Sequence, residues 1–204
     1  MIGNDVVDLH LAKKESNWNR PRFLFKIFSK KERLLIASAA NKTLMVWRLW
    51  TMKEAAYKAH QRRFNLSPKF NPTAFECSLI SGENGMVQIG TQSYETYSVK
   101  NSGFIYSEAK ILGFGRGVYS ELKENNSSKN IKTALNYFLS QGTNRPLAQF
   151  EIRKDKNGIP WLFTENKKQK IPFSISRHGR FSIFSCSVPF REEVYFNEAL
   201  TLRP

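Results

Sequence analysis

The sequence is poor in cysteine and has no long apolar run. Cys77 and Cys186 are the only cysteines among 204 residues, which excludes a disulfide-stapled miniprotein and a cysteine-rich zinc site and favours a reducing compartment. Charges interrupt every apolar stretch well before the ~20 residues that a bilayer span needs, so no membrane partner is expected. The N-terminal run carries Asp5 and Asp8, unlike a signal peptide. These features predict a cytoplasmic protein.

Acidic residues are also scarce. The chain has 17 Asp and Glu against 32 Lys and Arg, a formal net charge of +15, so its partner is expected to be anionic. Nucleic acid, a membrane surface, a phosphorylated cofactor and an acidic protein all satisfy that condition. A hydrophobic fraction of 41 % with 13 % aromatic residues is typical of a globular chain and excludes disorder as the main state. A chain of this length forms one domain or two small ones.

Apolar periodicity divides the chain into an early helical part and a later strand-rich part. The capping pattern Ser29-Lys-Lys-Glu32 offers an alternative start for the first long helix. The expected elements, in chain order, are a strand over 2–9, helices over 23–40 and 44–60, short strands within 74–112, a polar linker over 121–130, a helix over 131–140 and strands within 148–188. Asp155-Lys-Asn-Gly158 is a predicted turn. The predicted class is α+β, a helix pair packed on antiparallel strands.

The helix expected over 44–60 carries an unusual carboxylate. Apolar side chains surround nearly its whole circumference, so it should be largely buried. Trp47, Trp50, Glu54 and Tyr57 share one stripe at steps of three and four. A carboxylate on an aromatic stripe is costly unless a metal, a cation or hydrogen bonds satisfy it. Lys58 lies four residues on, which leaves open an ordinary Glu-to-Lys helix pair.

Two further carboxylates lie in the N-terminal strand. Residues three apart in an unbroken strand face opposite sides, so Asp5 and Asp8 converge only if the strand turns between them. Asp8 taken alone reads as a turn or cap residue, whereas Asp5 within an apolar strand is unusual. Asp5 and Glu54 together would suit Mg²⁺, which takes one or two carboxylates plus substrate phosphates. Lys53 and Lys58 beside such a site could steady those phosphates.

A third group of polar residues ends a predicted strand near the C-terminus. Ser174 and Ser176 share one face of this strand, and Arg177 and His178 follow them. Hydroxyls, a guanidinium and an imidazole at a strand end form a good phosphate-binding group. A single histidine such as His178 is also commonly structural.

Taken together, these motifs resemble the 4′-phosphopantetheinyl transferase superfamily. Its G-x-D motif stands here as Gly3-Asn4-Asp5, and its W-[ST]-x-K-E-A-x-x-K motif is matched at every defined position by Trp50 to Lys58. The family's F-x-x-x-E, G-x-P and S-[IL]-S-H elements correspond to Phe28 to Glu32, Gly158 to Pro160, and Ser174 to Arg177. The N-terminal place of G-x-D is similar to the short holo-acyl-carrier-protein synthase type, and the length is similar to the larger two-half enzymes.

This resemblance implies a fold, a reaction and a set of partners. The fold would be 4′-phosphopantetheinyl transferase-like, with two pseudo-related halves. Residues 1–120 would bind Mg²⁺ and coenzyme A, and residues 131–204 would follow the linker, or the chain would form one domain. The reaction would move the phosphopantetheine arm of coenzyme A to a serine of an acidic acyl or peptidyl carrier protein and release 3′,5′-ADP. The protein would be a monomer or a trimer.

The resemblance also assigns roles to individual residues. Asp5 and Glu54 would hold Mg²⁺, with Asp8 as a further acidic ligand, and Glu54 or a metal-bound water would take the serine proton. Lys58 would contact phosphate as a catalytic residue, and the expected coenzyme A contacts are Lys53, Lys58, Ser176, Arg177 and His178. One departure concerns the last motif, where Arg177 occupies the usual histidine position and His178 follows it. Either side chain could take over that phosphate contact.

Two other classes of function fit the positive charge. A basic nucleic-acid-binding module would present exposed aromatics among its Lys and Arg residues, whereas Trp47 and Trp50 lie in an apolar helix. A Mg²⁺-dependent nuclease would also need clustered carboxylates with lysine, but the common E-x-K strand pattern is absent, since Glu54 and Lys58 are helical. A family member that only binds carriers is a third alternative.

Overall fold

The computed structural model describes residues 1–115, 117–124, 128–143 and 150–187. Its helices are α1 (Leu9–Glu15), α2 (Phe23–Ile27), α3 (Lys30–Ser38), α4 (Lys42–Phe64), the short 3₁₀ helix η1 (Pro72–Ala74) and α5 (Ser128–Thr143). Its strands are β1 (Ile2–Asp8), β2 (Glu76–Ser81), β3 (Asn84–Ile89), β4 (Gln92–Lys100), β5 (Phe104–Ile111), β6 (Tyr119–Glu124), β7 (Glu151–Lys154), β8 (Pro160–Thr164), β9 (Lys167–Lys168), β10 (Phe173–His178) and β11 (Phe181–Cys186).

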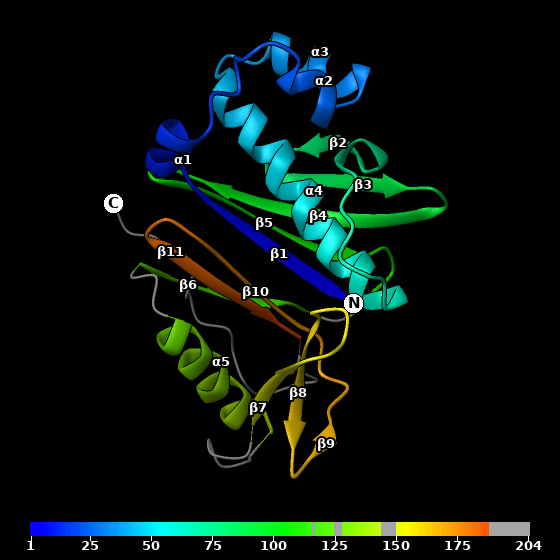
Figure 1. The fold of residues 1–204 in the computed structure, drawn as a ribbon, viewed down its shortest axis with the longest axis vertical. Coiled ribbons are helices and arrows are strands. Elements are labelled where there is room, and N and C mark those ends of the chain that lie inside the picture. The colour runs from blue at the N-terminus through cyan, green and yellow to red at the C-terminus, as the bar shows by residue number, and fades with distance from the viewer. Residues whose placement is uncertain (116, 125–127, 144–149, 188–204) are drawn as a thin grey trace.

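The first half of the chain packs one long helix on an antiparallel sheet. The strands pair in the order β1-β5-β4-β3-β2, and α4 crosses one face of this sheet (Figure 1). The core between them is made of small and branched side chains of α4 against β-branched and aromatic side chains of the sheet, including Val46, Leu49, Met52, Ala55, Ala59, Val87, Tyr94 and Ile105. Burial of α4 on nearly all sides agrees with its apolar circumference.

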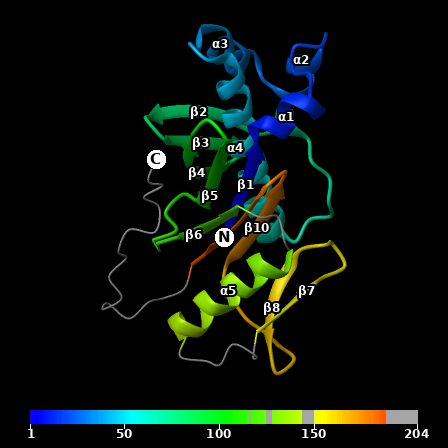
Figure 2. The same ribbon diagram turned by 90° about the vertical axis from the view of Figure 1, so that its left-hand side faces the viewer.

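The second half repeats this plan on a smaller scale. Strands β10, β11 and β6 form an antiparallel sheet with α5 packed against it, and the hairpin β7–β8 with β9 extends beyond it (Figure 2). In both halves a strand is followed by a helix and two hairpins, and the first strand pairs with the last, β1 with β5 and β6 with β11. The predicted α+β class with helices packed on antiparallel strands is therefore confirmed, and the two halves share this order of elements. In the first half, α1 to α3 lie between the strand and the long helix.

The two halves meet where β1 lies beside β10. The Asn4 backbone N–H donates to Ser174 Oγ at 3.1 Å, and the Asp8 backbone N–H donates to His178 Nδ1 at 2.9 Å. Both pairs have the same offset along the chain, so β1 and β10 run parallel and are bridged by side chains. Val6, Phe104, Tyr106, Phe181 and Ile183 form the apolar cluster behind this junction. The junction brings the end of β10 next to the acidic strand β1.

Three local predictions are settled by the structure. Ser29 caps α3 and forms a complete capping box with Glu32, so the long helix begins there and Phe23–Ile27 is a separate short helix. The predicted linker is wrong over 121–124, which belong to β6 and pair with β11, and over 128–130, which begin α5; residues 125–127 lie outside the described part. The turn over Asp155–Gly158 is confirmed, with the Gly158 N–H donating to the Asp155 carbonyl at 2.9 Å.

The division into domains at 1–120 and 131–204 stays a prediction. The described residues contain no helix with enough length and apolar character to cross a membrane.

Candidate active site

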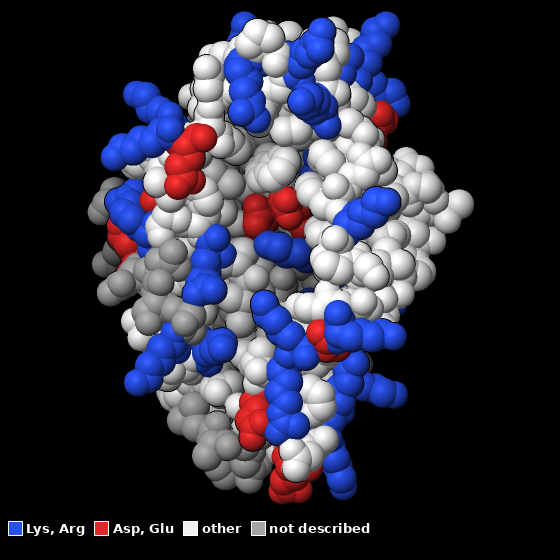
Figure 3. All heavy atoms as spheres, viewed as in Figure 1, with Lys and Arg blue, Asp and Glu red and all other residues white. Residues whose placement is uncertain are grey.

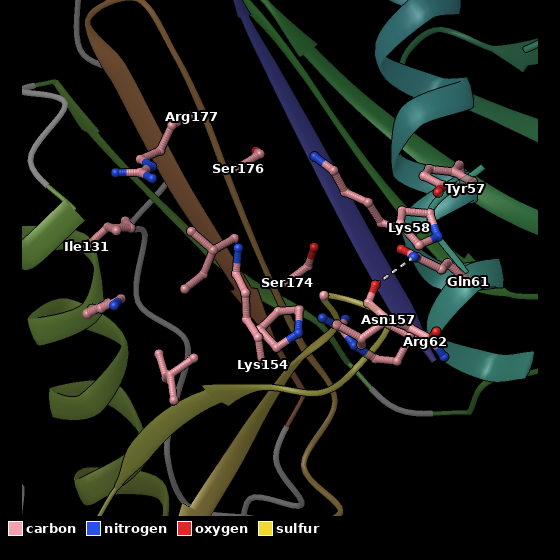
Figure 4. A pocket seen from close by; sticks show the side chains of 17 residues that line it. Tyr57, Lys58, Gln61, Arg62, Ile131, Lys154, Asn157, Ser174, Ser176 and Arg177 are labelled. Atoms are coloured by element: carbon pink, nitrogen blue, oxygen red, sulfur yellow. Dashed lines mark hydrogen bonds between the residues drawn. The ribbon is translucent and has the colours of Figure 1, made fainter. Parts of the chain in front are cut away.

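Two adjacent cavities open between the halves. The larger one, the basic cavity, has a volume of about 800 Å³ and is lined on one side by α4 and on the other by α5, β7 and β10 (Figure 4). Its cationic lining residues are Lys58, Arg62, Lys132, Lys154 and Arg177. The smaller one, the carboxylate cavity, has a volume of about 530 Å³ and is lined by Asp5, Glu54, Trp47, Trp50 and His178 among others. Arg177 borders both cavities, so the two cavities are neighbours and one ligand could reach both.

Glycine at position 3 allows β1 to lie directly against α4. A Cβ atom on Gly3 would overlap the Ala55 carbonyl oxygen and lie 2.7 Å from the Ala59 nitrogen, both in the α4 backbone. No larger residue fits without moving the strand. This close approach brings Asp5, two residues later, to the same face as Glu54 and Lys58 of α4. The glycine of the G-x-D motif therefore has a packing role, and this packing fixes the face of β1 on which the aspartate lies.

Glu54 and Asp5 share the carboxylate cavity and repel each other. Burial and, after it, the charge of Asp5 raise the pKa of Glu54 to about 7, against the lowering influence of Lys58. Burial also raises the pKa of Asp5, against the lowering influence of Lys58. Two carboxylates held this close, one with a pKa near neutrality, form either a cation site or a proton acceptor.

Lys58 links the two cavities. Its ammonium donates to Asp5 Oδ1 at 2.8 Å and to the Asn4 carbonyl at 2.9 Å, and the side chain lines the basic cavity. An ammonium has three protons, so these two bonds leave one for an anion in that cavity. The ordinary helix pair that the sequence left open is not formed, because Lys58 pairs with the strand carboxylate within the described structure.

The donors in the carboxylate cavity fit Mg²⁺. Asp5 and Glu54 offer oxygen ligands from a strand and a helix, and the neighbouring basic cavity could supply phosphate oxygens from a substrate. Among the described residues, no cluster of three or more His, Cys, Asp or Glu side chains suits a metal. The described residues therefore do not form a metal site from protein ligands alone. Asp5 and Glu54 fit a Mg²⁺ site that substrate oxygens and water complete.

Asp8 does not face this cavity, which contradicts its prediction as a metal ligand. Its Oδ1 accepts the backbone N–H groups of His10 and Leu11 as the cap of α1, and its Oδ2 accepts from the backbone and side chain of Arg180. Although burial opposes the charge, these hydrogen bonds lower the pKa of Asp8 to about 2. Strand alternation places Asp8 on the side of β1 opposite Asp5. Its role as the cap of α1 agrees with the alternative interpretation of Asp8 as a cap residue.

Lys53 also lies away from the site, and its prediction as a phosphate contact is wrong. The side chain is fully buried and its ammonium forms an ion pair with Glu32 at 2.8 Å, while donating to the carbonyls of Pro72 and Phe75. Glu32 is equally buried and also accepts the N–H of Cys77. Lys53 therefore ties α4 to α3 and to the start of β2.

The residues at the end of β10 separate into bridging and cavity-facing groups. Ser174 and His178 are engaged with β1, although Ser174 also lines the basic cavity and His178 also borders the carboxylate cavity. Ser176 lines the basic cavity, and its Oγ has no hydrogen-bond partner in the described structure. Arg177 is exposed and borders both cavities. Arg177 and Ser176 are thus placed for an anion, and His178 is already used as an acceptor.

Comparison with known proteins identifies the family. The model of the 4′-phosphopantetheinyl transferase superfamily matches residues 1–111, more than half of the chain. The chain belongs to this superfamily. No curated protein matches it.

Solved holo-[acyl-carrier-protein] synthases are similar to this phosphopantetheinyl transferase superfamily member at low identity. The Helicobacter pylori enzyme, in complex with coenzyme A, is 19 % identical with a TM-score of 0.45 and covers 54 % of this chain and 99 % of its own. The Thermotoga maritima enzyme is 13 % identical with a TM-score of 0.43, covering 82 % of this chain and 83 % of its own. The Neisseria meningitidis enzyme is 13 % identical with a TM-score of 0.40, covering 54 % and 95 %.

Sequence reasoning missed several cations of this superfamily member's basic cavity. Arg62 lies beyond the predicted helix end at residue 60, and Lys132 and Lys154 belong to no motif. Asn157, in the predicted turn, joins the cavity by accepting from Gln61 Nε2 through its carbonyl at 3.4 Å, as Figure 4 shows. Only the pairing of α4 with the second half reveals these side chains as neighbours.

Proposed function

We propose that this protein transfers the 4′-phosphopantetheine arm of coenzyme A to a serine of an acidic carrier protein, with Mg²⁺ and release of 3′,5′-ADP. The observation that carries the proposal is the junction of the two cavities, where Asp5 and Glu54 adjoin a pocket lined by lysine and arginine side chains. Figure 3 shows acidic atoms in a hollow near the middle of this face, with basic side chains around it. A polyanionic nucleotide with a reactive pyrophosphate suits that combination.

The chain's own residues account for the chemical step. The serine hydroxyl attacks the phosphorus that carries pantetheine, the bond from this phosphorus to the bridging oxygen breaks, and 3′,5′-ADP leaves. Glu54 accepts the serine proton; its pKa is about 7 in the metal-free site, and a carboxylate that binds Mg²⁺ through one oxygen keeps the other for the proton. Lys58 stabilises the charge that develops on the leaving phosphate, and Arg177 contacts a phosphate of the bound donor. Mg²⁺, when held by Asp5 and Glu54, would neutralise the pyrophosphate.

We assign to Arg177 the phosphate contact of the family's usual histidine, whose position Arg177 occupies in this sequence. We expect Arg177→Ala to raise the KM for coenzyme A about tenfold, the loss of one charge-assisted contact, with a smaller effect on kcat. His178→Ala should change KM less, because His178 accepts the Asp8 N–H. Steady-state kinetics on both variants checks this, and an unchanged KM in Arg177→Ala would contradict the assignment.

The decisive test of the proposed function is the intact mass of apo carrier proteins after incubation with this protein, coenzyme A and Mg²⁺. A gain of one phosphopantetheine arm, abolished by EDTA, supports the proposal. Coenzyme A that fails to bind would overturn it and favour the alternatives of a nucleic-acid-binding protein or a Mg²⁺-dependent nuclease. The positive net charge would steer an acidic carrier, so the rate should fall as salt rises.

A monomer should be sufficient for activity. The basic cavity combines Tyr57 and Lys58 of the first half with Lys154 and Arg177 of the second, so one chain supplies both walls. We expect specific activity to stay constant on dilution across any association detected by analytical ultracentrifugation. Activity that falls in proportion to a dissociating trimer would show that the site needs a second chain.

A further inference from the structure

A third cavity, the rear cavity, shares Arg62 with the basic cavity and has no part in the proposed reaction. This rear cavity, of about 470 Å³, is bounded by the N-terminus, the end of α4 and the segment that joins β9 to β10. Its lining residues are Met1, Arg62, Trp161, Lys168, Gln169, Lys170, Ile171 and Pro172. Its volume falls within the range of about 300–1,000 Å³ that is usual for small-molecule sites.

The lining of the rear cavity is divided between apolar walls and cations. Met1, Trp161, Ile171 and Pro172 are partly buried and form the walls. Lys168 and Lys170 are exposed, and the Lys168 ammonium lies 3.1 Å from the centroid of the Trp161 ring. No carboxylate lines this cavity among the described residues.

Arg62 supplies a buried cation to this cavity. The residue is 5 % exposed; its Nη1 donates to the Ile2 carbonyl at 3.0 Å, whereas its Nε has no partner in the described part of the chain. Burial lowers the pKa of Arg62 to about 10, which leaves it charged at neutral pH. This Nε atom is itself out of the reach of solvent, so an anion in the cavity would meet the charge of the guanidinium and not this N–H.

We propose that the rear cavity is a second ligand site that binds a small apolar carboxylate of the medium-chain fatty-acid kind. The carboxylate would lie among the charges of Arg62, Lys168 and Lys170, and the hydrocarbon would cover Trp161, Ile171 and Pro172. Charge complementarity commits the site to an anion, and the apolar walls exclude a bare inorganic ion as the preferred occupant. Because Arg62 also lines the basic cavity, occupancy would reduce the attraction of Arg62 for an anion there.

Octanoate is the probe that tests this site, by isothermal titration with the full chain. We expect saturable binding of one octanoate, weakened at least about tenfold in the double variant Lys168→Glu/Lys170→Glu. Lys167→Glu is the matched control, since Lys167 is an exposed neighbour that does not line the cavity. Lys154→Glu, which alters the basic cavity alone, should leave octanoate binding unchanged.

Three outcomes would overturn the proposal. If octanoate binds the double variant as tightly as it binds the parent protein, its site is not the rear cavity. Loss of binding in Lys154→Glu alone would place octanoate in the basic cavity. 1-Octanol or inorganic phosphate that binds as tightly as octanoate would show that the site lacks the combined apolar and anionic preference. None of these results depends on transferase activity, so the proposed function is tested separately.

Discussion

Glu54→Gln should reduce phosphopantetheine transfer by at least about a hundredfold, the usual contribution of a positioned general base. The amide has nearly the shape of the carboxylate but accepts no proton and is a poor ligand for Mg²⁺. Glu54 shares the carboxylate cavity with Asp5, and in the metal-free site its pKa of about 7 suits proton transfer at neutral pH. The intact mass of the carrier over time measures the loss. Turnover near that of the parent protein would remove Glu54 from the mechanism.

The same variant should be more stable than the parent protein at alkaline pH. Because the pKa of Glu54 is raised from 4.5 to about 7 in the fold, the folded state binds an extra proton between these values and stability falls as pH rises through them. Replacing the carboxyl group removes this cost, up to about 3 kcal/mol above pH ~7.5, and changes little near pH ~4.

Thermal melts at both pH values, without added metal, check this expectation. Glu83→Gln is the control, because Glu83 is exposed. A Glu54→Gln melting temperature equal to that of the parent protein at alkaline pH would mean that Glu54 is not destabilised by burial.

Lys53→Met should destabilise the fold by about 3–5 kcal/mol, the usual cost of leaving a buried charge without its partner. Lys53 and Glu32 are both fully buried and paired at 2.8 Å. Methionine keeps the volume but leaves the Glu32 carboxylate facing an apolar group. Urea unfolding measures the loss, and the double variant Glu32→Gln/Lys53→Met should recover most of it, because the uncompensated charge is then absent.

Kinetics on the same variant distinguish a structural role from substrate binding. Under conditions where Lys53→Met is fully folded, the KM for coenzyme A should equal that of the parent protein. Arg177→Ala, with an exposed side chain on the basic cavity, is the comparison. If fully folded Lys53→Met has a higher KM for coenzyme A than the parent protein, Lys53 contributes to coenzyme A binding after all.

The motifs predicted the residues of the carboxylate cavity because their spacing expresses local geometry. Steps of three and four along one helix place Trp47, Trp50 and Glu54 on one face, and the structure has them on one cavity. Gly3 marks the point where the strand touches the helix, which fixes the face of Asp5. The α+β class likewise follows from periodicity alone.

The sequence by itself thus determined the family and the class of fold, since each motif and each periodic segment consists of residues close together in the chain, and the two motifs named Asp5 and Glu54 as a candidate pair. Only the tertiary structure decided the role of Lys53, because α4 is apolar on nearly every face and a lysine next to Glu54 turns by about 100° toward α3. It also placed Arg177 and His178 differently. The parallel contact of β1 with β10 directs His178 to the Asp8 N–H and leaves Arg177 on both cavities, and that contact joins segments 170 residues apart.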